Sequence, residues 1–522
     1  MPTNGAESLI RTALEAGIDV CFANPGTTEM PLVAALDAVS GMRAVLGLFE
    51  GVCTGAADGY GRMAGRPALT LTHLGPGFAN GIANLHNARR ARSPIVNVIG
   101  DHATWHLASD APLTADIASL ARPVSHWVRK SASASDVARD TAEAIAAAGH
   151  EPGQVATLIV PADCQWNPAG GPASSIKPTT PPAVSSEAIS RSAELLRKHG
   201  GKAALFMGGM ALRARGLKAA GRIAAKIGCR LICETFPSRL ERGGGLPAVE
   251  KLPYFPEQAL EVLGKVSAIV IAGAPSPVAF FGYPNVPSSL IPAGCASTIL
   301  AAPTEDVPAA LEELAEALGS ARDAAPAAPR SSTATDRSAM PVGALNAASI
   351  GPVIAALMPE GCILMDEAAT TGLPFFAASA GALPHTYLAL TGGAIGQGLP
   401  CATGAAVACP DRRVIGFQAD GSGMYTVQSL WTQAREHLNV TTLLCNNRRY
   451  RILQVELARA GITEPGRNAR SLTSLGNPEI DWSRIAAGMG VPSVRVETAE
   501  DLYIQLGRAL QEPGPNLIEM LI

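Results

Sequence analysis

The stretch ADGSGMYTVQSLWTQAREHLNVTTLLCNN, residues 419–447, decides the fold. The apolar run VIGFQ precedes this stretch and is followed, after one alanine, by Asp420. A second apolar run, VTTLLC, lies within the stretch and is followed by a pair of asparagines, the second of which is Asn447. Between the runs, apolar residues recur at helical spacing over residues 427–438, so the pattern predicts a strand, a helix and a second strand. Strands this apolar are expected to be buried on both faces of a parallel sheet. The carboxyl ends of neighbouring parallel strands meet at one sheet edge, so we expect Asp420 and Asn447 to lie side by side.

The side chains of Asp420 and Asn447 both offer oxygen atoms, which suit Mg²⁺ or Ca²⁺. Mg²⁺ commonly completes its coordination shell with phosphate oxygens and water. Gly421 permits a phosphate to approach the backbone, and the N-terminus of the following helix favours the negative charge of that phosphate. The alternative interpretation is that Asp420 only caps this helix and the asparagines only form a turn.

Two stretches without hydrophobic periodicity, residues 165–186 and 320–341, are rich in Pro, Ser, Thr and Ala and are predicted to be linkers. They divide the chain into segments 1–165, 187–320 and 342–522, a number of domains that fits the length of the chain. Each segment alternates short apolar runs with stretches of helical period. The sequence therefore predicts an α/β protein of three Rossmann-like domains with parallel sheets.

Composition excludes several classes of function. With 47% hydrophobic residues, 16% charged residues and a net charge of −3, the chain is that of an ordinary globular protein without general attraction to nucleic acid or anionic membrane. The sequence contains no run of 18 or more apolar residues, so no membrane span is predicted. The N-terminus lacks the basic-then-apolar order of a secretory signal. The ten cysteines form no CxxC pair and are predicted to be reduced core residues. A cytoplasmic location is expected.

The order of strand, DGS turn, helix, strand and NN resembles the metal–diphosphate motif of thiamine diphosphate (ThDP) enzymes. The resemblance extends over essentially the whole chain and is greatest to the benzoylformate decarboxylase and acetolactate synthase group. One departure is Ala419, which stands where the family usually has Gly. The resemblance implies that segment 1–165 binds the aminopyrimidine, that 187–320 is a middle domain, and that 342–522 binds the diphosphate and the metal.

Site residues around the diphosphate follow from this resemblance. The implied metal ligands are Asp420, Asn447 and the backbone carbonyl of Arg449. The segment MDEAATTG resembles the other diphosphate-binding turn of the family. The implied contacts to the diphosphate are Gly421, Ser422, Asn447, Tyr450, Ala369 and Thr370.

Three further residues are implied at the aminopyrimidine. Glu50 follows an apolar strand and begins a helix, where the family has a glutamate that hydrogen-bonds the ring and promotes proton exchange. Without the resemblance, Glu50 is an ordinary first-turn glutamate favoured by the helix dipole. In LTGGAIGQGLP, Gly393 is expected to accept a hydrogen bond from the amino group, and Ile395 to donate its amide and wedge a side chain that is stiff at χ1 beneath the bent cofactor.

Substrate contacts are implied in the first and middle segments. Thr27, in FANPGTTEMPL, stands where the decarboxylase has a substrate-contacting serine, and His73, in LTLTHLGPG, stands where it has a catalytic histidine. The second catalytic histidine of that enzyme falls on Phe280, so this proton relay is not expected. His102 and His106 are candidates for the missing proton donor, against the ordinary interpretation of loop histidines.

The resemblance implies ThDP- and Mg²⁺-dependent, non-oxidative decarboxylation of a 2-oxo acid, followed by release of an aldehyde or by joining to a second carbonyl. Glu456 stands where an aromatic substrate contact is usual, so a smaller or more polar 2-oxo acid than benzoylformate is expected. One alternative is an acetolactate synthase-like carboligase. Another is a non-catalytic ThDP-binding assembly protein, against which the complete set of Glu50, Asp420 and Asn447 argues.

Cofactors and partners complete these expectations. FAD is not expected, because FMGGMALRARG in the middle segment lacks a GxGxxG fingerprint. The family places its active sites at a subunit interface, so a homodimer or a dimer of dimers is expected, with a small-molecule substrate and neither nucleic acid nor membrane as partner.

Overall fold

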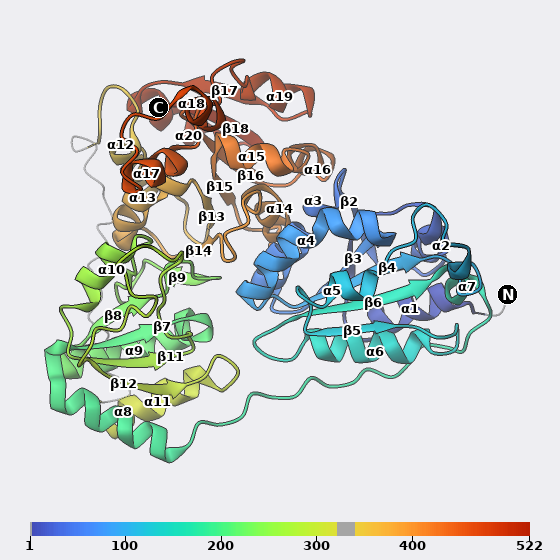
Figure 1. The fold of residues 1–522 in the computed structure, drawn as a ribbon, viewed down its shortest axis with the longest axis horizontal. Helices are drawn as coiled ribbons and strands as arrows, with labels where there is room; N and C mark the ends of the chain where they lie inside the picture. Colours follow the sequence, from blue (N-terminus) through green and yellow to red (C-terminus); the bar gives the residue numbers. More distant parts are fainter. Residues whose placement is uncertain (1–2, 321–339) are drawn as a thin grey trace. The chain divides into compact units, whose positions relative to one another are not determined.

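The computed structural model describes residues 3–320 and 340–522, and most of the second expected linker lies outside them. The chain forms two compact units (Figure 1). The first unit comprises residues 1–179, 337–376 and 390–522, and the second comprises residues 180–336 and 377–389. The expected division into three domains at the boundaries given above remains a prediction.

The N-terminal part of the first unit is a parallel sheet with strand order β2-β1-β3-β4-β6-β5. Its strands are β1 (Val20–Asn24), β2 (Arg43–Leu46), β3 (Ala68–His73), β4 (Ile95–Asp101), β5 (Trp127–Lys130) and β6 (Val155–Pro161). Its helices are α1 (Gly5–Glu15), α2 (Met30–Ala38), α3 (Glu50–Ala64), α4 (Leu74–Ala91), α5 (Ile117–Ala121), α6 (Val137–Ala148) and α7 (Ala162–Trp166). Every residue of β4 and β6 is buried, as expected for strands covered on both faces.

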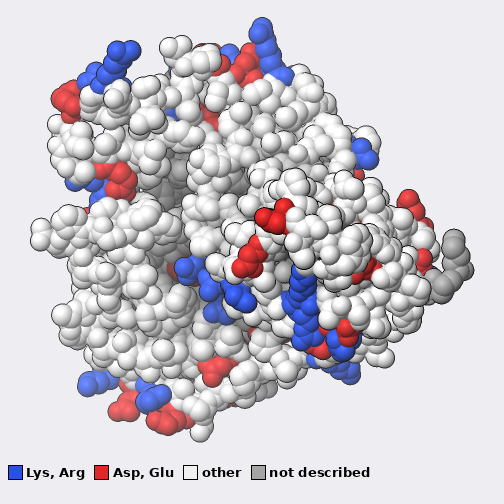
Figure 2. All heavy atoms as spheres, turned by 45° about the vertical axis from the view of Figure 1, so that its right-hand side comes forward, with Lys and Arg blue, Asp and Glu red and all other residues white. Residues whose placement is uncertain are grey.

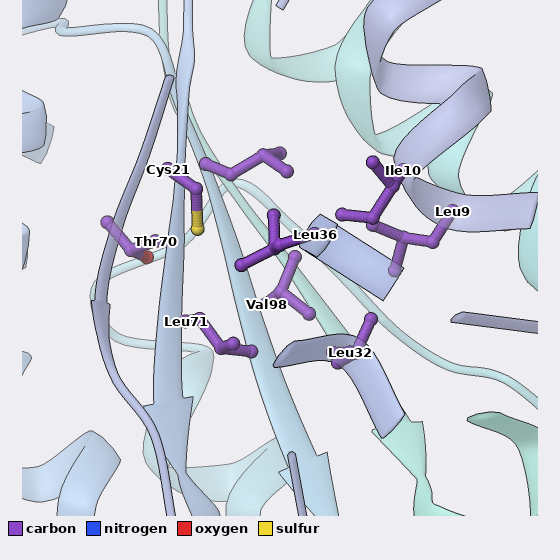
Figure 3. A pocket seen from close by; sticks show the side chains of 9 residues that line it. Leu9, Ile10, Cys21, Leu32, Leu36, Thr70, Leu71 and Val98 are labelled. Atoms are coloured by element: carbon purple, nitrogen blue, oxygen red, sulfur yellow. The ribbon is translucent and has the colours of Figure 1, made fainter. Parts of the chain in front are cut away.

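A small cavity between α1, α2 and this sheet is lined almost wholly by apolar side chains, among them Leu9, Leu32, Leu71 and Val98 (Figure 3). Its volume of about 10 Å³ is close to the minimum that one water molecule needs. The cavity is therefore a packing void of the core and not a ligand site.

The C-terminal part of the first unit contains the stretch that opened the sequence analysis. Its parallel strands run in the order β17-β18-β16-β15-β13. They are β13 (Ile363–Glu367), β15 (Val414–Ala419), β16 (Val440–Asn446), β17 (Ser493–Val496) and β18 (Asn516–Leu521). The helices are α12 (Ala347–Leu357), α13 (Gly372–Ala378), α14 (Gly398–Ala408), α15 (Asp420–Gly423), α16 (Ser429–Arg435), α17 (Arg451–Arg459), α18 (Arg467–Thr473), α19 (Trp482–Gly488) and α20 (Ala499–Ala509).

Strands β15 and β16 are direct neighbours, with Ala419 paired to Cys445 in parallel register. Asp420 and Asn447 therefore follow adjacent strand ends at one edge of the sheet. Helix α14 also packs against α3 of the N-terminal part (Figure 1). Glycine permits this close approach of the two helices. A Cβ atom on Gly59 would collide with the carbonyl oxygen of Cys401, and a Cβ atom on Gly404 would collide with that of Ala56.

The second unit has its own parallel sheet, in the order β10-β8-β7-β11-β12. The strands are β7 (Ala203–Met207), β8 (Arg230–Cys233), β10 (Glu250–Lys251), β11 (Ala268–Ala272) and β12 (Ala296–Ala301). The helices are α8 (Ser186–His199), α9 (Ala214–Ile227), α10 (Pro256–Leu263) and α11 (Val307–Ala317). An antiparallel pair, β9 (Leu240–Arg242) with β14 (His385–Ala389), departs from the parallel pattern.

These sheets and their covering helices confirm the α/β fold with parallel sheets that the sequence predicts. None of the helices in the two described ranges combines the length and the apolar composition that a membrane span requires. On the face shown in Figure 2, Lys and Arg side chains lie in small groups among Asp and Glu side chains, with wide uncharged areas between them.

Candidate active site

Asp420 is the first residue of α15 and is 2% exposed. Its Oδ1 accepts a hydrogen bond of 2.8 Å from the backbone N–H of Gly421, and its Oδ2 accepts one of 2.7 Å from the N–H of Arg448. Arg448 adopts the left-handed conformation, with φ of 57°, which turns its N–H toward the carboxylate. The two strand ends are thus joined through this single carboxylate.

The charge of Asp420 is incompletely compensated. Burial raises the pKa of its carboxyl, and backbone N–H donors oppose that rise. Within the residues that the structure describes, no Lys or Arg forms an ion pair with Asp420. A divalent cation at this position would supply the missing positive charge, so the carboxylate fits the metal that the resemblance implies.

Asn447 and Arg449 continue this edge of the sheet. Oδ1 of Asn447 accepts a hydrogen bond of 3.0 Å from the N–H of Arg449, which leaves one lone pair for another partner. An open cavity begins at Asn447 and continues over Arg449 to Ser474. The described residues hold no cluster of three His, Cys, Asp or Glu side chains suited to a metal. A site built from one carboxylate, one amide and one carbonyl does not require such a cluster.

The predicted diphosphate contacts lie on turns at the same edge. Ser422 is buried in α15, and a Cβ atom on Gly421 would collide with the ring of Tyr450. Ala369 follows β13 on an exposed turn with φ of 50°, and Thr370 is the next residue. A non-glycine residue in this conformation costs free energy, and such strained residues cluster at functional sites.

The loop that carries Gly393 and Ile395 is held by helix α4. The amide side chain of Asn87 donates to the carbonyl of Ala394 at 2.7 Å and accepts from the N–H of the same residue at 3.2 Å. Nδ2 of Asn84 donates to the carbonyl of Gly396 at 3.3 Å. The predicted aminopyrimidine loop is therefore fixed by side chains from the N-terminal part of the first unit.

Glu50 begins α3 and is 7% exposed. Nδ2 of Asn80 donates to its Oε2 at 3.0 Å, and no second donor reaches the carboxylate within the described residues. A Cβ atom on Gly77 would lie 2.7 Å from Oε1, so glycine at this position leaves that oxygen room. A buried carboxylate with one free oxygen fits the proton exchange expected of Glu50.

His73 ends β3 and contacts a residue that the sequence analysis missed. Its Nδ1 lies 2.7 Å from Oε2 of Glu29, which is fully buried. The same oxygen accepts a hydrogen bond of 2.8 Å from the N–H of Gly26, and Thr28 Oγ1 donates to Oε1 at 2.6 Å. Glu29 therefore fixes the His73 ring through Nδ1, and no hydrogen bond to Nε2 is formed within the described residues. The available signal was the acidic residue three positions after Gly26, which is the spacing of a capping box.

The remaining sequence candidates lie in loops of the first unit or in the second unit. Thr27 is exposed and begins the short turn that ends at Glu29. The rings of His102 and His106 contact each other edge to face, with centroids 5.4 Å apart. Phe280, in the second unit, packs against Phe236 with centroids 5.6 Å apart.

Glu456 lies on α17, where its Oε2 is 3.5 Å from Nε of Arg459. A side chain engaged in this ion pair gives no apolar surface for a phenyl ring.

Comparison with known proteins adds to this geometry. Residues 3–120 match the "Thiamine pyrophosphate enzyme, N-terminal TPP binding domain", and residues 375–520 match the corresponding C-terminal TPP binding domain. The "Putative acetolactate synthase large subunit IlvX" of Mycobacterium tuberculosis is 50% identical over 99% of both chains. This chain belongs to the thiamine pyrophosphate enzyme family.

Other members of the thiamine pyrophosphate enzyme family are more distant. Benzoylformate decarboxylase of Pseudomonas aeruginosa is 28% identical, over 97% of this chain and 96% of its own. Among solved structures, the ThDP-dependent 4-hydroxybenzoylformate decarboxylase of Rhodococcus jostii RHA1 has a TM-score of 0.85 and 26% identity. That alignment covers 99% of this chain and 98% of the other. The family assignment made from the sequence motifs is confirmed, and with it the binding of ThDP.

Proposed function

We propose that this family member is a Mg²⁺-dependent, non-oxidative decarboxylase of a 2-oxo acid that releases an aldehyde or joins it to a second carbonyl. The observation that carries the metal part of the proposal is the buried carboxylate of Asp420, which has backbone donors but no cationic partner within the described residues. Asn447 and the carbonyl of Arg449 are proposed as the further ligands. Turns 369–370 and 421–422 then hold the diphosphate.

ThDP, when bound, supplies the electron sink for decarboxylation. The protein orients the reactants and moves protons. Glu50 exchanges a proton with the aminopyrimidine through its free Oε1, while Asn80 holds the other oxygen. Gly393 and Ile395 contact the ring from the loop that α4 fixes.

His73 is the proposed proton carrier on the substrate side. Glu29 orients its ring through Nδ1, so Nε2 is the atom that gives or takes the proton. Thr27, exposed on the neighbouring turn, is the proposed contact to the substrate carboxylate or carbonyl. His102 and His106 are alternative donors only if they reach the same substrate in the assembled enzyme.

The alternative proposal is an acetolactate synthase-like carboligase. Two observations favour it: the relative with 50% identity carries an acetolactate synthase name, and Phe280 replaces the second histidine expected of a benzoylformate decarboxylase. A non-catalytic assembly role is the weaker candidate, because Glu50, Asp420 and Asn447 are all present. In every case we propose a homodimer or a dimer of dimers with its active sites at the subunit interface.

A panel of 2-oxo acids tests the proposal. The purified protein is incubated with ThDP, Mg²⁺ and each acid, and CO₂, aldehydes and acyloins are measured. We expect CO₂ from a small or polar 2-oxo acid, with aldehyde for a decarboxylase and acyloin for a carboligase. Absence of CO₂ from every acid, combined with tight ThDP binding, supports the non-catalytic alternative.

A further inference from the structure

We propose that Glu367 is a positioning residue that holds three cofactor-facing segments in register: the turn after β13, the loop 393–398 and the turn that begins at Asp420. The proposal rests on the proposed function, because the segments matter only if they bind ThDP and its metal. Glu367 is the last residue of β13 and is 4% exposed. One residue separates Glu367 from Ala369, the first of the two proposed diphosphate contacts on the turn after β13.

The carboxylate of Glu367 receives donors on both oxygens. Oε1 accepts from the backbone N–H of Gly396 at 2.7 Å and of Gln397 at 3.3 Å. Oε2 accepts from the N–H of Gly398 at 2.6 Å and from Nε2 of Gln418 at 3.1 Å. These backbone N–H groups lie at the N-terminal end of α14, where they have no acceptor within the helix. The Glu367 side chain provides that acceptor. One carboxylate therefore fixes the end of the loop that carries Ile395.

Gln418 extends the contact to the metal turn. It lies on β15 two residues before Asp420 and is 1% exposed. Its Nε2, which donates to Glu367, also donates to Oγ of Ser422 at 2.6 Å. The proposed diphosphate contact Ser422 is thus linked to the aminopyrimidine loop through three successive hydrogen bonds, by way of Gln418 and Glu367.

Gln397 extends the contact in the other direction, toward α3. Its backbone N–H donates to Glu367, and its side-chain Nε2 donates to Asp58. Asp58 is fully buried and forms a two-pronged ion pair with Arg62 one turn further along α3, with both distances 2.8 Å. Glu367 is therefore part of a buried polar network that also includes the helix beginning at Glu50.

A carboxylate is required here, and an amide does not replace it. In Glu367→Gln, an NH₂ group replaces one of the two oxygens. Because both oxygens accept hydrogen bonds in the wild type, the NH₂ group faces N–H donors in either orientation of the amide. If it points toward Gln418, that side chain can turn its own oxygen inward, but the N–H of Gly398 still faces a donor. Buried donors without acceptors cost free energy, so the loop end is expected to move away.

Glycine at position 398 provides an independent test. A Cβ atom on Gly398 would lie 2.7 Å from Oε2 of Glu367 and would collide with Oε1 of Gln418. The backbone of Gly398 is not in the left-handed region, so an alanine is not strained by its own conformation. Gly398→Ala therefore displaces the carboxylate from the loop while every charged residue is retained.

The experiment compares wild type, Glu367→Gln, Gly398→Ala and a control, Asp140→Asn. Asp140 is 1% exposed, belongs to the same unit and accepts hydrogen bonds from Arg129 and Ser131 far from the site in sequence. Its substitution measures the general effect of neutralising a buried carboxylate. The readouts are thermal midpoints without cofactor, ThDP affinity at saturating Mg²⁺ by calorimetry, and hydrogen exchange of the peptide spanning residues 390–400.

We expect ThDP affinity to fall at least about tenfold in Glu367→Gln and Gly398→Ala, in the range known for residues that orient ligands. Exchange in the 390–400 peptide is expected to accelerate in both, and both readouts are expected to stay at wild-type values in Asp140→Asn. ThDP affinity within twofold of wild type in Gly398→Ala, or in a folded Glu367→Gln, overturns the inference. Failure of wild type to bind ThDP instead overturns the proposed function.

Discussion

At the scale of single residues, two carboxylates carry the proposed chemistry, and they are compensated differently. Glu50 has one donor, Asn80, and a free oxygen, whereas both oxygens of Asp420 accept backbone N–H groups. The first arrangement leaves a proton acceptor available for a reaction. The second fixes an anion in one orientation, as a metal ligand requires.

Replacement of Glu50 by Gln is expected to lower turnover about 100-fold or more, because the amide cannot exchange the proton. Its shape and its hydrogen bond with Asn80 are largely retained, so the thermal midpoint is expected to change little. Steady-state kinetics with the best 2-oxo acid checks this, with Glu15→Gln on the exposed end of α1 as control. Wild-type turnover in Glu50→Gln contradicts the proposed role.

Replacement of Asp420 by Asn is expected to weaken Mg²⁺ binding at least about tenfold, because a neutral amide offers less charge to the cation. The measurement is a Mg²⁺ titration of activity or of ThDP binding at saturating ThDP. Asp411→Asn, on the exposed turn before β15, is the matched control. Equal Mg²⁺ dependence in Asp420→Asn and wild type rejects Asp420 as a ligand.

At the scale of elements, the parallel strands place the proposed site residues at their carboxyl ends, whereas the antiparallel pair β9–β14 contains a buried histidine. His385 begins β14 opposite Arg242 and is 3% exposed. Nδ1 donates to the carbonyl of Leu383 at 2.8 Å, while Nε2 has no hydrogen-bond partner in the part of the chain that the structure describes. This arrangement fits a neutral ring, and burial lowers the pKa of His385 to about 4.

Because the folded pKa of His385 lies below the ordinary value of 6.5, its contribution to stability is complete above pH 6.5. It is lost progressively as the pH falls from 6.5 toward 4, since the unfolded chain then binds the extra proton, and it amounts to at most about 3 kcal/mol. His385→Asn retains a donor for Leu383 but does not titrate. We expect the thermal midpoint of this variant to fall less steeply than that of wild type across this interval.

Thermal scans at a series of pH values between 4 and 7 make this comparison, and a variant with Asp19 replaced by Asn controls for an exposed titrating carboxyl. Parallel curves for His385→Asn and wild type show that another group governs the acid sensitivity.

At the scale of the whole molecule, the proposed contacts to ThDP and Mg²⁺ come from segments distributed over the first unit. Binding of these ligands is therefore expected to stabilise the folded state of the protein. A ligand present at 100 times its Kd stabilises the folded state by about 2.7 kcal/mol. We therefore expect ThDP with Mg²⁺ to raise the thermal midpoint by several degrees, and by more than the sum of the two separate effects. Differential scanning with ThDP, with Mg²⁺, with both, and with both plus a chelator checks this; additive shifts contradict a shared site.

The sequence by itself determined the alternation of strands and helices, the parallel sheets and the neighbouring strand ends at Asp420 and Asn447. These features are local: apolar periodicity fixes which segments are buried, and an apolar run bounded by polar residues marks where a strand ends. Motif spacing was also sufficient to identify the family, because its residues lie within short, continuous stretches.

Only the tertiary structure decided which partners the buried polar groups have. Glu29 meets His73 across 44 positions, and Glu367 meets Gly398 across 31 and Gln418 across 51. The pairing of His385 with Arg242 joins strands from distant parts of the sequence in an antiparallel register. Such contacts depend on the path of the loops and the register of the sheets, which arise from the packing of the whole chain, whereas hydrophobic periodicity records only burial.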